Sequence, residues 1–293
     1  MKWSDFEIKE ILLGDKLYPS ELAKINDAPK KLFYRGEINS ELSNKTIAIV
    51  GSRRETGYGR QVVSSFVTDF VSNKITTISG FMYGVDTDVH KQTINCGGIT
   101  IAVFGCGLNY VYPSENDNLY SQILESGGVV FSEYEANTKP KLWTYPQRNR
   151  IVSGLSTLGV LVVEAKKNSG SLITANIAKK QKKKIWLIPG PITSSSSEGT
   201  NDLIKAGVGK LVTDSSDILG GVVNTKGQEN VYIDLDLFEQ NICKILSSEE
   251  LTIDELSVIL NIEIVELSSK LSMMGLKGLV LEVNGKYRVL KKL

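Results

Sequence analysis

The chain has 293 residues, of which 41% are hydrophobic and 23% are charged, and its formal net charge is only +1. These proportions are ordinary for a globular protein with one large core and a smaller module, and no apolar run approaches the roughly 18–20 residues that a membrane span needs. Three cysteines without paired spacing and a single histidine exclude a disulfide framework and the usual zinc ligand sets, so we expect neither a metal nor a cofactor.

Residues 1–40 form a short lead-in segment in which we expect no strands. The stretches around Tyr18-Pro19 and Ala28-Pro29 are expected to pack on the sheet that follows. Acidic residues stand close to Met1, where a signal peptide would have a basic flank and an apolar run. We therefore expect a cytoplasmic protein.

Residues 41–222 alternate short, continuous apolar runs with helical patterns. This alternation is typical of buried parallel strands joined by crossover helices. It predicts an α/β fold with an extended Rossmann-like, mostly parallel sheet. The expected strands are 47–50, 75–79, 100–104, 129–132, 159–164, 185–189 and 210–212, and the expected helices include 59–72, 86–95, 116–125, 171–181 and 200–206.

Three turns of the kind that hold phosphates stand where predicted strands end. Strand C-termini and the helix N-termini after them share one rim of a parallel sheet, where free N–H groups and helix dipoles attract anions. Three such turns on one rim predict a ligand with several phosphates. This favours a polynucleotide over a coenzyme as the ligand. The first turn holds Gly51, Ser52, Arg53 and Arg54; the second, ahead of a helix-like stretch, holds Arg148, Asn149 and Arg150; the third holds Lys166, Ser169, Gly170 and Ser171.

Other interpretations of these motifs stay open. The glycines do not follow the dinucleotide-binding spacing, and the second strand ends in Ser79-Gly80 without an acid for a ribose. An arginine in a turn can also pair with an acid, and a Gly-Ser turn can serve packing alone. Asp86 and His90 stand four apart on one helix face, an arrangement that is more often structural than catalytic.

A polar linker over residues 223–234 precedes a unit at 235–293 with three predicted helices, 238–246, 252–260 and 264–274. Two short runs joined by Asn284-Gly285 then predict a hairpin. Three helices and a hairpin indicate a winged-helix domain. Its third helix carries a single lysine, and residues 231–293 hold ten acidic residues against seven lysines and arginines. This favours a protein contact or a structural role over duplex reading.

Taken together, the motifs resemble the DNA-processing protein A (DprA/Smf) family. They run in the family's order from about residue 18 to 220: Val50 to Arg53, Ser79-Gly80, Gly84 to Asp86 with His90, Thr100 to Val103, Tyr112-Pro113, Ser132 to Tyr134, Pro146 with Arg148 to Arg150, Val163 to Ala165, Ser169 to Ala175, Pro189-Gly190 and Gly199 to Ile204.

The resemblance implies a dimeric protein of natural transformation or recombination that binds and protects single-stranded DNA and loads the RecA recombinase, without catalysis. It assigns phosphate holding to Gly51, Ser52, Arg53, Arg148 and Arg150, with Ser169, Gly170 and Ser171 lining the same pocket. The chain departs from the family at Met82-Tyr83, where Ala-Arg is usual, and at Val89, where Ala is usual. Its lead-in is also too short for the sterile-alpha-motif-like domain of many members.

Two rival functions remain. Related folds hydrolyse nucleoside monophosphates with a phosphate turn and a glutamate, as in the phosphoribohydrolases, but the Pro-Gly-Gly-x-Gly-Thr turn of such enzymes is absent from this sequence. A regulator that reads duplex DNA through the winged helix is disfavoured by the acidic third helix.

Overall fold

A computed structural model describes residues 1–38, 44–220, 236–247, 249–277, 279–283 and 285–289. The chain divides into two compact units, Met1–Gly227 and Gln228–Leu293. The predicted linker at 223–234 lies outside the described residues. No helix in the described ranges is both long and apolar enough to cross a membrane.

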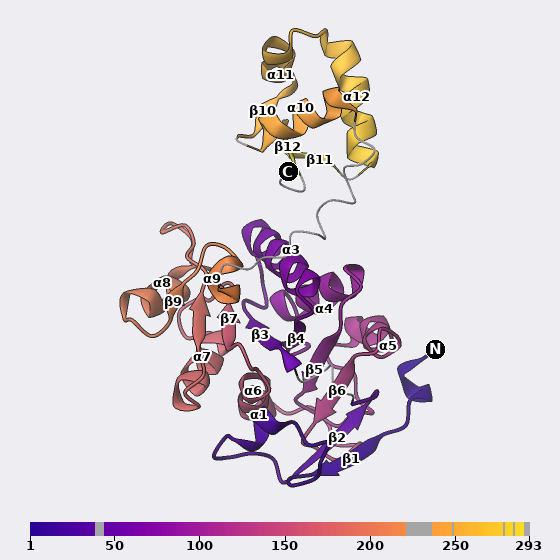
Figure 1. The fold of residues 1–293 in the computed structure, drawn as a ribbon, viewed down its shortest axis with the longest axis vertical. Helices are drawn as coiled ribbons and strands as arrows, with labels where there is room; N and C mark the ends of the chain where they lie inside the picture. Colours follow the sequence, from indigo (N-terminus) through magenta and orange to yellow (C-terminus); the bar gives the residue numbers. More distant parts are fainter. Residues whose placement is uncertain (39–43, 221–235, 248, 278, 284, 290–293) are drawn as a thin grey trace. The chain divides into compact units, whose positions relative to one another are not determined.

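The first unit is built on a nine-stranded sheet in the order β1-β2-β6-β5-β4-β3-β7-β8-β9 (Figure 1). Within the set β3 to β9, every pair of neighbouring strands is parallel. Strand β2 is antiparallel to both of its neighbours, β1 and β6. The strands are β1 (Lys9–Leu12), β2 (Lys31–Arg35), β3 (Thr46–Val50), β4 (Thr76–Ser79), β5 (Thr100–Phe104), β6 (Val129–Ser132), β7 (Val160–Val162), β8 (Ile185–Leu187) and β9 (Lys210–Leu211). All seven strands predicted from the sequence are present, and the predicted fold class is confirmed.

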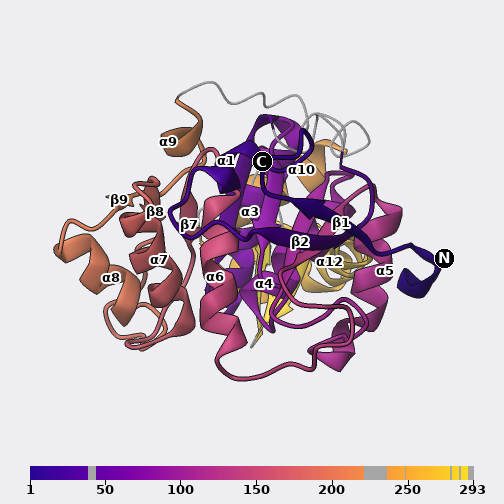
Figure 2. The same cartoon turned by 90° about the horizontal axis from the view of Figure 1, so that it is seen from below.

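Helices cover both faces of this sheet (Figure 1, Figure 2). Successive residues of β3 point to opposite faces: Ile47 and Ile49 pack against helices α3 and α4, while Ala48 and Val50 belong to the core beneath α6 and α7. Because both faces are covered, the strand is apolar throughout. The helices of this unit are α1 (Ser20–Ala23), α3 (Gly57–Ser72), α4 (Val85–Asn95), α5 (Asp117–Glu125), α6 (Thr144–Gly154), α7 (Gly170–Lys180), α8 (Glu198–Lys205) and α9 (Ser216–Leu219), with 3-10 turns η1 (Trp3–Asp5) and η2 (Ser114–Asn116).

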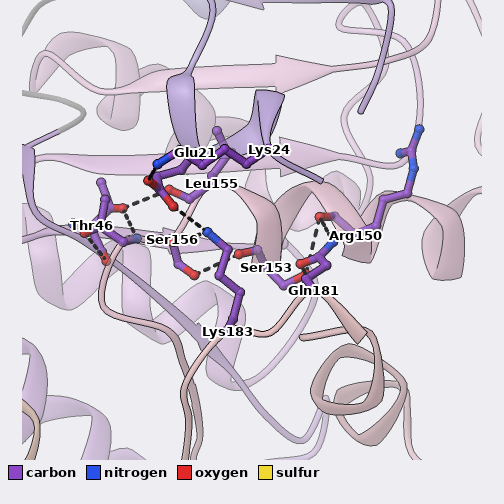
Figure 3. Close-up of polar contacts among 10 residues, drawn as sticks. Glu21, Lys24, Thr46, Arg150, Ser153, Leu155, Ser156, Gln181 and Lys183 are labelled. Atoms are coloured by element: carbon purple, nitrogen blue, oxygen red, sulfur yellow. Dashed lines mark hydrogen bonds and ion pairs between the residues drawn. The ribbon is translucent and has the colours of Figure 1, made fainter. Parts of the chain in front are cut away.

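The lead-in segment differs from its prediction. The expectation that residues 1–40 carry no strands is wrong, because β1 and β2 form a hairpin that pairs with β6 and extends the sheet. As expected, the segment packs on the sheet, and helix α1 contributes to this packing. The Lys183 ammonium bonds both the Glu21 carboxylate, at 2.7 Å, and the carbonyl oxygen of Ser156, at 2.8 Å (Figure 3). The lead-in is therefore attached to the ends of α6 and α7.

The second unit holds three helices and a three-stranded sheet in the order β10-β12-β11. Its helices surround a core that includes Ile242, Leu256 and Leu271, and Asp236 and Thr252 cap α10 and α11 in capping boxes. This arrangement is compatible with the predicted winged-helix domain. Its elements are α10 (Leu237–Leu246), β10 (Leu251–Thr252), α11 (Ile253–Leu260), α12 (Ile264–Leu276), β11 (Val280–Val283) and β12 (Lys286–Val289).

Candidate anion-binding site

A pocket of about 440 Å³ opens where the strand order reverses, between β3 and β7. In open α/β sheets, ligands bind at this switch point, outside the carboxyl ends of the strands. The loops after β3, β4 and β7 and the start of α6 line the pocket. Ten of the eleven residues predicted for the site lie along it: Gly51, Ser52, Arg53, Arg54, Arg148, Asn149, Lys166, Ser169, Gly170 and Ser171.

The turn after β3 presents two cations to this pocket. The Ser52 hydroxyl donates to the carbonyl oxygen of Arg54 at 2.8 Å and accepts from the N–H of Arg54 at 3.1 Å, which fixes the turn. Gly51 packs so closely that an added Cβ would lie 2.6 Å from Val85. The side chains of Arg53 and Arg54 are exposed, so they can meet an anion with little desolvation of their own.

The buried Glu164 joins the loop after β3 to the end of β7. Its Oε1 accepts from the hydroxyl of Thr56 at 2.6 Å, and its Oε2 accepts from the N–H of Thr56 at 3.0 Å. A Cβ at Gly59 would lie 2.5 Å from the same carboxylate, so this position has no room for a side chain. Glu164 therefore sets the spacing between two walls of the pocket.

Arg148 forms part of the pocket floor. The expectation that Arg148 and its neighbours stand in a turn ahead of a helix is wrong: they lie inside α6. The Arg148 side chain is buried and donates to the carbonyl oxygens of Gly80 and Val103, at the ends of β4 and β5. Burial raises the pKa of the neighbouring Asp86 carboxyl, and the Arg148 charge opposes that rise. Arg148 thus satisfies carbonyl oxygens of two neighbouring strands, and its charge favours the ionised form of a buried acid.

Arg150 lies outside the pocket, in contrast to its predicted place. Two residues along an α-helix turn a side chain by about 200°, so Arg150 leaves the face that carries Arg148. Its guanidinium pairs with Glu133 at 2.6 Å and Asp27 at 3.2 Å. Figure 3 shows this side chain extending away from Gln181, which donates to the Arg150 carbonyl oxygen. Its role is to connect α6 to the lead-in segment and to the end of β6.

The N-terminus of α7 forms the wall opposite the arginines. Ser169 is the N-cap residue and makes no side-chain cap bond; its hydroxyl instead lies 2.9 Å from that of Ser171. The helix dipole and the first-turn N–H groups therefore face the pocket, with the exposed Lys166 beside them.

Asp86 and His90 do not form a pair. The His90 Nδ1 lies 2.7 Å from the Thr100 hydroxyl, and burial lowers the pKa of His90 to about 3. Asp86 accepts instead from the N–H of Met82 at 3.2 Å. Within the described residues, no group of three or more histidine, cysteine, aspartate or glutamate side chains is placed to hold a metal ion.

Sequence reasoning did not foresee that the charge of Arg148 acts on the buried Asp86 carboxyl, nor that the ring of Tyr145 faces Arg53. The Tyr145 ring lines the pocket, with the Arg53 guanidinium carbon 6.0 Å from its centre and the ring of Tyr112 at 5.7 Å. An aromatic residue next to Pro146 was visible in the sequence, but nothing local indicated that it would face Arg53.

The fold and the pocket define a doubly wound α/β protein with a candidate anion-binding site at its switch point. A family model described as DNA recombination-mediator protein A matches residues 9–222. Protein Smf of Escherichia coli is 40% identical over 204 residues, which are 70% of this chain and 54% of that protein. DNA processing protein DprA of Streptococcus pneumoniae is 40% identical over 205 residues, 70% of this chain and 71% of that protein. The chain belongs to the DNA recombination-mediator protein A family, and the resemblance seen in its motifs is confirmed.

Solved structures agree with this assignment. The X-ray structure of DNA processing protein A from Streptococcus pneumoniae aligns with a TM-score of 0.68 and 38% identity over 75% of each chain. A structure of the Helicobacter pylori protein, described for its single-stranded DNA binding mode, aligns with a TM-score of 0.66 and 27% identity, over 75% of this chain and 97% of that one. The match to the Escherichia coli protein spans about half of that protein's length.

Proposed function

We propose that this chain binds and protects single-stranded DNA at the switch-point pocket, acts as a homodimer and delivers the strand to the RecA recombinase in transformation or recombination. The observation that carries the DNA-binding part is the pocket itself, in which the exposed Arg53 and Arg54 face the start of α7. The name of the family as a recombination mediator supports the delivery step.

The pocket suits a polymer of phosphates more than a single nucleotide. Its positive groups come from two separate walls, the turn after β3 and the α7 N-terminus with Lys166. Successive phosphates of one strand can meet both walls. The Tyr145 ring beneath Arg53 offers a surface for a base. The Helicobacter pylori relative is described as binding single-stranded DNA, which supports the same ligand here.

The proposed activity involves no catalysis. A hydrolase would need an acid free to act on the substrate, and the buried acids Asp86 and Glu164 beside the pocket already have partners. Asp86 accepts from the N–H of Met82, and Glu164 accepts both bonds from Thr56. Release of base or phosphate from nucleoside monophosphates by the purified protein would instead support the phosphoribohydrolase alternative.

The test is fluorescence anisotropy of a labelled single-stranded oligonucleotide, with a duplex of the same sequence, at two salt concentrations. We expect tighter binding to the single strand and a steep loss of affinity with salt. Arg53→Glu should weaken binding by at least about tenfold, because a hydrogen bond to a charged group contributes roughly 1.5–3 kcal/mol. Lys180→Glu is the matched control, since Lys180 is exposed at the opposite end of α7. Equal affinity in the two variants would refute the pocket assignment.

RecA delivery and dimer formation need separate measurements. RecA nucleation on oligonucleotide bound by this protein should be faster than on the same DNA covered by a single-strand-binding protein. The Arg53→Glu variant should lose this acceleration. Light scattering should give the mass of two chains, and a mass of one chain would refute the homodimer.

A further inference from the structure

Three exposed aromatic side chains follow three neighbouring strands at the rim that carries the pocket. Tyr83 lies in the loop after β4, Tyr112 in the loop after β5, and Trp143 at the end of the loop after β6. Their exposed fractions are 40%, 43% and 58%. The sheet order β6-β5-β4-β3 places these loops in succession beside the pocket.

Ring contacts connect this row to the pocket. The ring of Tyr112 lies 5.7 Å from that of Tyr145, over which the Arg53 guanidinium sits at 6.0 Å. The hydroxyl of Tyr83 donates to the Glu115 carboxylate at 3.0 Å, which joins the loop after β4 to the segment that also carries Tyr112. At the far end, Trp143 packs edge-on against Tyr134 at 6.2 Å, and the Lys141 ammonium lies 6.0 Å from its ring centre.

The two halves of the rim differ in chemistry. On the side of β7, small polar groups and backbone N–H groups face the solvent, as at Ser169 and Gly170. On the side of β4 to β6, the large rings of Tyr83, Tyr112 and Trp143 face the solvent instead. Phosphates are held by the first kind of surface and bases by the second, because every base has a flat face that stacks on an aromatic ring.

We propose that Tyr83, Tyr112 and Trp143 form a base-stacking subsite, so that a single strand anchored by its phosphates at β3 and β7 runs across β4 and β5 toward β6. This inference rests on the proposed DNA binding and adds to it a path for the strand and a reason to prefer single strands. Bases paired in a duplex present their edges, not their faces, and cannot stack on this row.

The experiment compares two probes of equal length and charge, an oligothymidylate and an oligonucleotide made of abasic sites. The wild-type protein should bind the oligothymidylate more tightly. Alanine at Tyr83, Tyr112 or Trp143 should each lower the affinity for oligothymidylate about tenfold, within the range for loss of one stacked base. The same variants should leave affinity for the abasic probe unchanged. Tyr83→Phe, Tyr112→Phe and Trp143→Phe keep a ring and should retain binding.

The outcomes separate the two proposals. Failure of the wild-type protein to bind either probe would overturn both. Equal wild-type affinity for the two probes, or equal losses on both probes in the alanine variants, would overturn the stacking subsite alone. Should an alanine variant fail to fold, Trp143 fluorescence gives a second measurement: oligothymidylate should quench it, the abasic probe should not, and the quenching should disappear in Trp143→Phe. Equal quenching by both probes would contradict the subsite.

Discussion

The hydroxyl of Thr56 donates to the Oε1 atom of Glu164 over 2.6 Å, although the two residues are 108 positions apart in the chain. The N–H of Thr56 donates to Oε2 of the same carboxylate. These bonds hold together the loop after β3 and the end of β7, the two strands that flank the pocket. The Glu164 carboxylate thereby helps to determine where Arg53 stands relative to the α7 N-terminus.

Glu164→Ala should therefore weaken DNA binding without removing any cation. Two hydrogen bonds to a charged acceptor would be lost, and the free energy of unfolding should fall by roughly 3 kcal/mol. Denaturant unfolding and oligonucleotide anisotropy measure the two effects. Glu164→Gln keeps an acceptor for one bond and should lie between wild type and the alanine variant. Normal affinity in Glu164→Ala would show that the spacing of the walls does not depend on this contact.

Arg148→Met should cost more stability than any substitution of the exposed Arg53. It removes the charge that favours the ionised form of the buried Asp86 carboxyl, and it leaves the carbonyl oxygens of Gly80 and Val103 without this donor. Losing one partner of such buried charged interactions costs about 3–5 kcal/mol. Adding Asp86→Leu should restore part of the loss, because the unpaired acid is then gone. A double-mutant cycle by denaturant unfolding gives the coupling energy between the two residues, and strictly additive losses would contradict an electrostatic interaction between Arg148 and Asp86.

Glu55 should make the protein less stable as pH rises. Burial and a hydrogen bond with Asp88 raise the pKa of Glu55 from 4.5 to about 8; Glu164 adds to the rise and Arg60 opposes it. Because the folded chain holds this proton more tightly than the unfolded chain, the melting temperature should fall between about pH 4.5 and pH 8. Glu55→Gln should flatten this fall, and Asp88→Asn should reduce it. An unchanged pH slope in Glu55→Gln would refute the assignment to this carboxyl.

Lys183 and Lys24 both pair with Glu21 and provide a matched comparison (Figure 3). The Lys183 side chain is 12% exposed, whereas that of Lys24 is 67% exposed. Lys183→Ala should lower the free energy of unfolding by about 2 kcal/mol, because it breaks two well-shielded hydrogen bonds. Lys24→Ala should change it by less than about 1 kcal/mol, as is usual for surface pairs. Equal effects would mean that the lead-in segment is not anchored through Lys183.

The parallel sheet could be predicted because its strands are covered on both faces, which leaves continuous apolar runs such as Ile47 to Val50. The edge strand β1 could not, since Lys9-Glu10-Ile11-Leu12 mixes charged and apolar residues. An edge strand has solvent on one side and needs no apolar run. Periodicity alone therefore could not distinguish this hairpin from a loop.

Local turn chemistry was enough to predict most of the pocket, because glycine, serine and arginine after a strand have a direct physical meaning. It failed at Arg150, where the helical geometry of α6 separates two arginines that look equivalent in the sequence. Contacts between distant segments, such as Arg148 with Gly80 and Val103, depend on the strand order. No local pattern specifies that order.

The β1–β2 hairpin bears on how small a working fragment of this protein can be. Residues 44–220 contain every residue that lines the pocket, so a fragment starting at residue 44 would hold the whole proposed binding site. Yet β2 pairs with β6 along Phe33, Tyr34 and Arg35, and its removal would leave the backbone groups of an apolar strand open to any other chain. Such a fragment should aggregate through strand addition at β6, although its binding chemistry is intact.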